Sequence, residues 1–134
     1  DNVITVASNI LKDAEKICSV RERCTPKPLD VNDQDGLRAL LKDADIVISY
    51  VPAFLHPKIA EVCIAESRNM ITASYISPQL AALDDQVKHK GLTFLNEIGF
   101  DPGIDHCATM KIIDEVNSHG GKIIEYESYG SGLP

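Results

Sequence analysis

Short apolar runs alternate along this chain with stretches in which apolar residues recur every three or four positions. The short runs are rich in β-branched side chains and are bounded by turn-forming residues, which is typical of buried strands. Runs of this kind predict strands at residues 3–6, 45–49, 69–73, 92–95 and 122–129, with a strand end or turn at 29–32. The run at 122–129 alternates two kinds of side chain, as a strand with two different faces does.

The stretches between these runs have the spacing of amphipathic helices. They predict helices at residues 10–18, 33–43, 59–64, 77–90 and 101–119. Ser77-Pro78 and Asp101-Pro102 each place a capping side chain before a proline, which is a strong signal for a helix start. Pro26 and Pro28 exclude a helix where they stand.

Strict alternation of short strands and helices predicts a parallel sheet covered by helices on both faces. We therefore expect an α/β fold with a Rossmann-like, doubly wound parallel sheet. The pattern changes between Gly99 and Gly103, where buried strands give way to an alternating one. This change predicts a dinucleotide-binding domain at residues 1–100 and the beginning of a second α/β domain, for substrate binding or dimerisation, at residues 101–134.

A dinucleotide-binding domain usually opens with a strand, the glycine loop G-x-G-x-x-G and a helix. This sequence contains no such loop, and its first glycine, Gly36, lies within a helical pattern. We therefore expect residues 3–6 to form the second strand, with a unit of roughly 25 residues preceding Asp1. The alternative is a complete doubly wound domain of another type, which never needed the loop.

Composition narrows the classes of function. A formal net charge of −7 over 134 residues argues against nucleic acid, whose binding depends on Lys and Arg. The apolar runs are far shorter than the roughly 20 residues of a membrane helix, so we expect no membrane partner. Cys18, Cys24, Cys63 and Cys107 contain no C-x-x-C pair, which predicts reduced thiols, an intracellular protein and no metal. Cys63 and Cys107 fall on apolar helix faces and are expected in the core.

Three stretches resemble the saccharopine dehydrogenase family, in its glutamate-forming branch. They are ISYVPAFLHP at residues 48–57, TASYISP at 72–78 and NEIGFDPGIDH at 96–106, and residues 128–134 fit the same pattern. The resemblance implies an oxidoreductase that uses NAD or NADP to oxidise saccharopine to glutamate and aminoadipic semialdehyde in lysine metabolism. It also implies a continuing substrate domain beyond residue 134, so that the isolated chain is expected to be inactive.

The resemblance further implies roles for individual residues, which follow predicted strands at the end where open α/β sheets bind ligands. Substrate contacts are implied for Ser74, Tyr75 and Asp101, and Tyr75 and Asp101 are the candidates for proton transfer. Each has a simpler interpretation, Asp101 as a helix cap and Tyr75 as a half-buried aromatic. The implied cofactor contacts are Ala7, Ser8, Asn9, Asp30, Val31, Val51, Phe100 and Pro102.

Two departures from the family pattern bear on activity. Asn9 stands where family members that use NADP place an arginine, and no carboxylate is present there to bind a free ribose diol. Because residues 6–14 look more like the dehydrogenase part of bifunctional lysine-degrading enzymes, we expect NAD rather than NADP. Gly130 stands where much of the family has cysteine, so any role of that thiol is absent.

The sequence leaves open the roles of two histidines, the alternative functions, the location and the oligomeric state. His56 and His106 have a structural interpretation, since a lone histidine is weak evidence for a site. A related polyamine or homospermidine-type dehydrogenase and a non-catalytic dinucleotide-binding module are alternative functions. The resemblance implies cytoplasm or mitochondrial matrix and is compatible with a homodimer of the full-length protein.

Overall fold

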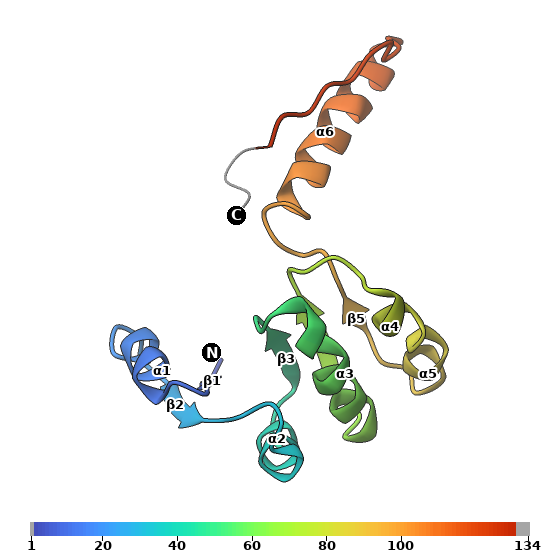
Figure 1. Ribbon diagram of the computed structural model, residues 1–134. Helices are drawn as coiled ribbons and strands as arrows, with labels where there is room; N and C mark the ends of the chain where they lie inside the picture. Colours follow the sequence, from blue (N-terminus) through green and yellow to red (C-terminus); the bar gives the residue numbers. More distant parts are fainter. Residues whose placement is uncertain (1, 131–134) are drawn as a thin grey trace.

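The computed structural model describes residues 2–130, in which parallel strands alternate with helices (Figure 1). This arrangement confirms the α/β prediction. The elements in chain order are β1 (Ile4–Ser8), α1 (Leu11–Cys18), β2 (Cys24–Pro28), α2 (Gln34–Leu41), β3 (Ile46–Ser49), the 3-10 turn η1 (Ala53–Leu55), α3 (His56–Ala65), β4 (Asn69–Thr72), α4 (Pro78–Ala81), α5 (Asp84–His89), β5 (Phe94–Leu95) and α6 (Ile104–Ser118).

The strands form two parallel sheets, one of β1 and β2 and one in the order β3-β4-β5. A doubly wound sheet has the spatial strand order 3-2-1-4-5-6. The pair β2-β1 matches strands 3-2 of that order, and the three strands β3-β4-β5 match strands 4-5-6. Among residues 2–130, β1 pairs only with β2, and β3 pairs only with β4. The edges of β1 and β3 that have no strand partner among these residues are thus the two that flank the first position of that order.

One hydrophobic cluster supports the three-stranded sheet. α2 and α3 pack against each other, and α3 also contacts β3, β4 and α4. α3 is buried on most sides and is correspondingly apolar. We call the buried residues of this region the core cluster; they are Leu37, Leu41, Ile59, Ala60, Val62, Cys63, Met70 and Leu80.

The two-stranded sheet is covered by α1, of which only Ala14 and Cys18 are buried. A disulfide joins Cys18 to Cys24, so the expectation of four reduced thiols is wrong for this pair. The parallel register explains the error, because α1 must end beside the start of β2 for β2 to run along β1. This return brings the two Cα atoms to 5.0 Å, within the usual range for a disulfide.

The predicted elements at residues 24–32 and 77–90 need correction. β2 lies at Cys24–Pro28, before the predicted strand end, and includes both prolines. It has a single strand partner among the described residues, and edge strands tolerate proline because one side needs no ladder. The helix predicted at 77–90 is divided into α4 and α5, although Ser77 caps α4 as expected by accepting the Leu80 N–H at 3.2 Å.

The region after residue 100 differs most from the prediction. α6 begins at Ile104 rather than at the Asp101-Pro102 pair, and Gly103 precedes it with a φ of 143°. A Cβ at Gly103 would collide with the backbone of Gly99, so only glycine fits this tight turn. Cys107 is exposed on α6, which contradicts its predicted place in the core.

The strand predicted at residues 122–129 is not formed. After α6 the chain returns alongside the helix in an irregular, exposed segment (Figure 1). A strand needs a neighbour to complete its backbone hydrogen bonds, and none adjoins this segment within residues 2–130. None of the helices in the described part of the chain has the length and apolarity to cross a membrane.

Candidate functional site

The carboxyl ends of β1 and β2 carry the first group of predicted site residues. The Leu29 N–H donates to the Ser8 carbonyl at 3.0 Å, which holds the two strand ends together. Ser8 Oγ accepts the Ile10 N–H at 3.1 Å, so the hydroxyl hydrogen can donate outward. Asp30 closes a turn, since its Oδ1 accepts from the backbone and side-chain nitrogens of Asn32 at 2.8 and 3.0 Å. Ala7 and Asn9 are exposed beside them.

Val31 and Val51, two of the implied cofactor contacts, lie on the core cluster. Both are partly buried and pack against the core cluster. Val51 follows β3, and Val31 follows β2, so they bring the ends of the two sheets onto a common apolar support. Packing alone accounts for their apolar character, and their contact with a cofactor stays a prediction.

The second group lies at the end of β4 and in the loop before α6. The Tyr75 hydroxyl donates to Asp101 Oδ1 at 3.0 Å, so the structure joins the two residues predicted for proton transfer. The hydrogen bond to Asp101, together with the negative charges of Asp101, Asp105 and Glu97, raises the pKa of the Tyr75 phenol. Tyr75 is 62% exposed, so this pair faces outward and is accessible to a ligand.

The loop that carries Asp101 is tightly hydrogen-bonded. The Gly99 N–H donates to the Pro102 carbonyl at 2.9 Å, and the Ile104 N–H donates to the Gly99 carbonyl at 3.0 Å. Pro102 is buried, whereas Phe100 is 80% exposed. Asp101 is therefore not the predicted helix cap, and its carboxylate is left for Tyr75 and for groups outside the loop.

Gly130 lies next to this carboxylate. A Cβ at Gly130 would be 3.7 Å from Asp101 Oδ2, an ordinary van der Waals distance. The position has room for a side chain, and a cysteine there would approach the catalytic candidate directly. The space that a cysteine side chain would fill therefore lies directly beside Asp101.

Beneath Tyr75 lies a buried hydroxyl network around His56, which sequence reasoning treated as structural. His56 Nδ1 lies 2.8 Å from Ser49 Oγ, and Nε2 lies 2.8 Å from Ser74 Oγ and 3.1 Å from Thr72 Oγ1. Burial lowers the pKa of His56, which favours the neutral ring. A signal for Ser49 and Thr72 existed, since each is the polar residue that ends an apolar strand.

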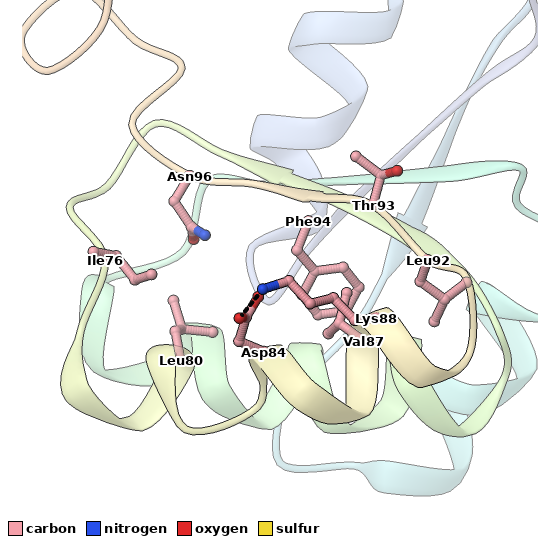
Figure 2. Close-up of a pocket in the computed structure, with 9 residues that line it drawn as sticks. All are labelled: Ile76, Leu80, Asp84, Val87, Lys88, Leu92, Thr93, Phe94 and Asn96. Atoms are coloured by element: carbon pink, nitrogen blue, oxygen red, sulfur yellow. Dashed lines mark hydrogen bonds and ion pairs between the residues drawn. The ribbon is translucent and has the colours of Figure 1, made fainter.

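A hollow lies elsewhere, between β5 and the helices α4 and α5 (Figure 2). Its volume is about 270 Å³, and its lining includes Leu80, Val87 and Phe94. The Lys88–Asp84 ion pair of 2.6 Å, between two residues of α5, lies on one side of it, as Figure 2 shows. None of the predicted site residues lines this hollow, so it is separate from the candidate site. No three His, Cys, Asp or Glu side chains of residues 2–130 gather as metal ligands would.

Comparisons with known proteins identify the family. Residues 1–95 match the model described as "Saccharopine dehydrogenase NADP binding domain", and residues 99–134 match "Saccharopine dehydrogenase C-terminal domain". The chain belongs to the saccharopine dehydrogenase family. The resemblance predicted from the three sequence stretches is thereby confirmed, and with it the Rossmann-like α/β fold.

The relatives include enzymes of two kinds. The chain is 42% identical over 98% of its length to the NADP(+)-dependent, L-glutamate-forming saccharopine dehydrogenase of Pyricularia oryzae, of which it covers 29%. It is also 42% identical over 98% of its length to the mitochondrial alpha-aminoadipic semialdehyde synthase of Bos taurus, of which it covers 14%. The chain thus spans less than a third of these relatives.

A solved structure gives the same result. The apo, glutamate-forming saccharopine dehydrogenase from Saccharomyces cerevisiae superposes with a TM-score of 0.80 at 39% identity. The match covers 90% of this chain and 27% of that one. This chain therefore resembles the yeast enzyme in sequence as well as in the arrangement of strands and helices.

The comparisons overturn our preference for NAD. The matching model is that of an NADP-binding domain, and the fungal relatives are named for NADP(+). The prediction depended on Asn9 in place of an arginine and on the likeness of residues 6–14 to the bifunctional enzymes. The residues present fit NADP, because the end of β1 offers the Ser8 hydroxyl and the Asn9 amide and carries no carboxylate to repel a 2′-phosphate.

Proposed function

We propose that this chain supplies the cofactor-facing strand ends and the proton-transfer pair of an oxidoreductase that oxidises saccharopine with NADP. The products are glutamate and aminoadipic semialdehyde, as the reaction of this family implies. The observation that carries the proposal is the Tyr75–Asp101 hydrogen bond at the carboxyl ends of the strands. Open α/β sheets bind their ligands at this end.

The chemistry divides between the cofactor and the protein. NADP, when bound, accepts the hydride from the carbon next to the secondary amine of the substrate. The protein must take up the amine proton and guide water to the resulting imine. Asp101 suits the first task, because its Oδ1 accepts the Tyr75 hydroxyl while its Oδ2 lies on the open side towards Gly130. Tyr75 holds a proton that it can return, and Ser74 lies beside it as a substrate contact.

The cofactor contacts belong to the same proposal. Ala7, Ser8 and Asn9 would hold the adenosine ribose and its phosphate, and Asp30 and Val31 the adenine side. Val51 would lie under the cofactor, where it already packs on the core cluster. Phe100 and Pro102 flank Asp101, so they would place the nicotinamide side of the cofactor close to the proton-transfer pair.

The organisation of the protein is also proposed. The two matched segments, 1–95 and 99–134, support a boundary near Asp101 between the dinucleotide-binding domain and the second domain. A small amino-acid substrate and a homodimer of the whole protein remain our proposals. The cytoplasm or the mitochondrial matrix is the proposed location, and the Bos taurus relative is named as mitochondrial.

Reduction of NADP⁺ by the natural polypeptide that carries this sequence, with saccharopine as substrate, tests the function. Asp101→Asn is expected to lower kcat by about 10²- to 10⁴-fold, since it removes the proton acceptor. Tyr75→Phe is expected to lower kcat by about tenfold, because the hydroxyl acts through its bond to Asp101.

Asp84→Asn is the matched control, because Asp84 is a carboxylate at the hollow beside β5, away from the strand ends. Saccharopine-dependent NADP⁺ reduction that survives Asp101→Asn unchanged would contradict the assigned role. Faster turnover of a carboxylated polyamine than of saccharopine would favour the polyamine-type alternative. Dinucleotide binding without any turnover would favour the non-catalytic module, to which Gly130 in place of cysteine also points.

A further inference from the structure

We infer that His56 is a positioning residue that holds the Ser74–Tyr75 turn and thereby keeps the Tyr75 hydroxyl on Asp101. Its consequence for turnover rests on the proposed function, whereas its effect on the Tyr75–Asp101 pair does not. Three short contacts of His56 join separate segments of the chain.

His56 connects the carboxyl ends of two neighbouring strands. It is the first residue of α3 and is only 1% exposed. Nδ1 contacts Ser49 Oγ, at the last residue of β3, and Nε2 contacts Thr72 Oγ1, at the last residue of β4. Because both ring nitrogens are engaged, the imidazole fixes the two strand ends relative to each other and to the start of α3.

The same nitrogen that contacts β4 also holds the turn beyond it. Nε2 lies 2.8 Å from Ser74 Oγ, and the Ser74 N–H donates to Thr72 Oγ1 at 3.2 Å. Ser74 is thus held by its side chain as well as by its backbone. Tyr75 follows directly and is 62% exposed, so its ring has little packing of its own. The direction of the Tyr75 side chain therefore depends on the backbone that Ser74 anchors.

The network is satisfied without a charge on the ring. With a proton on Nδ1, the ring donates to Ser49 and accepts a hydroxyl at Nε2; with a proton on Nε2, the directions reverse. All three partners are hydroxyls, which can donate or accept. A purely packing role would be filled more simply by an aliphatic side chain, as in the neighbouring core cluster. The polar ring stands at the one end of the sheet where the proposed chemistry takes place.

Two substitutions distinguish the two sides of the ring. In His56→Asn the amide lies near the place of Nδ1, so it can keep the Ser49 contact but loses Ser74 and Thr72. In His56→Gln the amide reaches the place of Nε2, so it can keep Ser74. If His56 positions the turn through Nε2, the glutamine variant should resemble the natural protein and the asparagine variant should not. Ser49→Ala is the control that removes a contact on the side away from the turn.

The primary measurement is the titration of the Tyr75 phenol in this chain, followed by NMR of labelled tyrosine and assigned with Tyr75→Phe. Its raised pKa depends first on the hydrogen bond to Asp101, so loss of that bond should move the titration towards the ordinary value. We expect this shift in His56→Asn, and an unchanged titration in His56→Gln and Ser49→Ala. An unchanged Tyr75 titration in folded His56→Asn would overturn the inference.

The second measurement is turnover of the natural polypeptide. We expect His56→Asn to lower kcat by about 10- to 100-fold with little change in KM for NADP, and His56→Gln to recover most of it. If the natural protein does not oxidise saccharopine, the proposed function fails while the tyrosine titration still decides the role of His56. If His56→Asn does not fold, Ser74→Ala takes its place, because it removes the same contact with Nε2. A Tyr75 titration in Ser74→Ala that matches the titration in the natural chain would also overturn the inference.

Discussion

The β1–β2 sheet and the β3-β4-β5 sheet carry different parts of the proposed site, and they are stabilised in different ways. The first buries only Ala14 and Cys18 of its covering helix and is cross-linked between Cys18 and Cys24. The second is supported by the eight-residue core cluster and by the buried His56 network. The two-stranded sheet therefore depends on a local covalent link, and the three-stranded sheet depends on packing.

This difference has a structural origin. α2, α3 and α4 all contribute to the core cluster, whereas within residues 2–130 the two-stranded sheet packs mainly against α1. β1 and β3, each of which has one edge without a strand partner among residues 2–130, also keep apolar side chains in solvent. Ile4 is 45% exposed, and Ile46 and Ile48 are 47% and 56% exposed. Stability should thus be uneven across the molecule, as local unfolding generally shows.

The largest expected effect follows from removing the core of the three-stranded sheet. Met70 is 1% exposed in β4, at the centre of the core cluster. Met70→Ala should lower the free energy of unfolding by about 2–5 kcal/mol, through lost burial and the cavity left behind. Urea denaturation measures this change. Val20→Ala, at a residue 78% exposed, is the control and should change the value by less than about 0.5 kcal/mol. If both substitutions lower the free energy of unfolding by the same amount, the core cluster is packed no better than the region around Val20.

Loss of the disulfide should have a smaller effect, confined to the other sheet. The linked cysteines are six residues apart, and closing so short a loop stabilises by about 2 kcal/mol. In the double variant Cys18→Ala with Cys24→Ala, amide exchange should accelerate in β1 and β2 and remain slow in β3 and β4. Cys107→Ala, which removes an exposed free thiol, is the control. Faster exchange in both sheets would mean that the disulfide supports the whole fold.

Much of this fold was predictable because its strands are short, apolar and regularly spaced. β3 and β4 coincide with predicted runs, Ser77 caps α4 as predicted, and Asp33, the predicted first residue of its helix, is the cap of α2. β2 was missed because prolines obscure a strand that needs only one partner. The segment 122–129 has the alternation of a strand, yet whether a strand forms depends on a neighbour that no local pattern reveals.

The site was predictable from motif resemblance rather than from physical patterns alone. Tyr75 and Asp101 were expected to take part in proton transfer, and the structure places them within hydrogen-bond distance. Their roles in binding and catalysis stay predictions. Ser49 and Thr72 are marked as polar strand ends, but their contact with His56 could not be foreseen. The members of the network come from β3, α3, β4 and the following turn, and only the folded chain brings these segments together. The choice of NAD failed because no basic residue marks the end of β1.

The smallest expected effect is a dependence of stability on pH that belongs to the three-stranded sheet alone. Burial lowers the pKa of His56 from its ordinary value of 6.5 in the folded chain. The unfolded chain therefore binds a proton first as the pH falls. The contribution of the neutral ring to stability is complete above pH 6.5, decreases below it and is lost once the pH has passed through the lowered value.

Urea denaturation between pH 7.5 and 5.5 should thus show a modest loss of stability in the natural chain that is absent in His56→Gln. The partners of the ring in β3, β4 and the following turn are hydroxyls, which do not titrate in this range. Exposed His119 is the control, since His119→Gln should leave the dependence intact. If amide exchange in β1 and β2 accelerates on acidification as much as in β3 and β4, the two sheets unfold together. In that case the difference between a covalently linked sheet and a packed sheet would not extend to their stabilities.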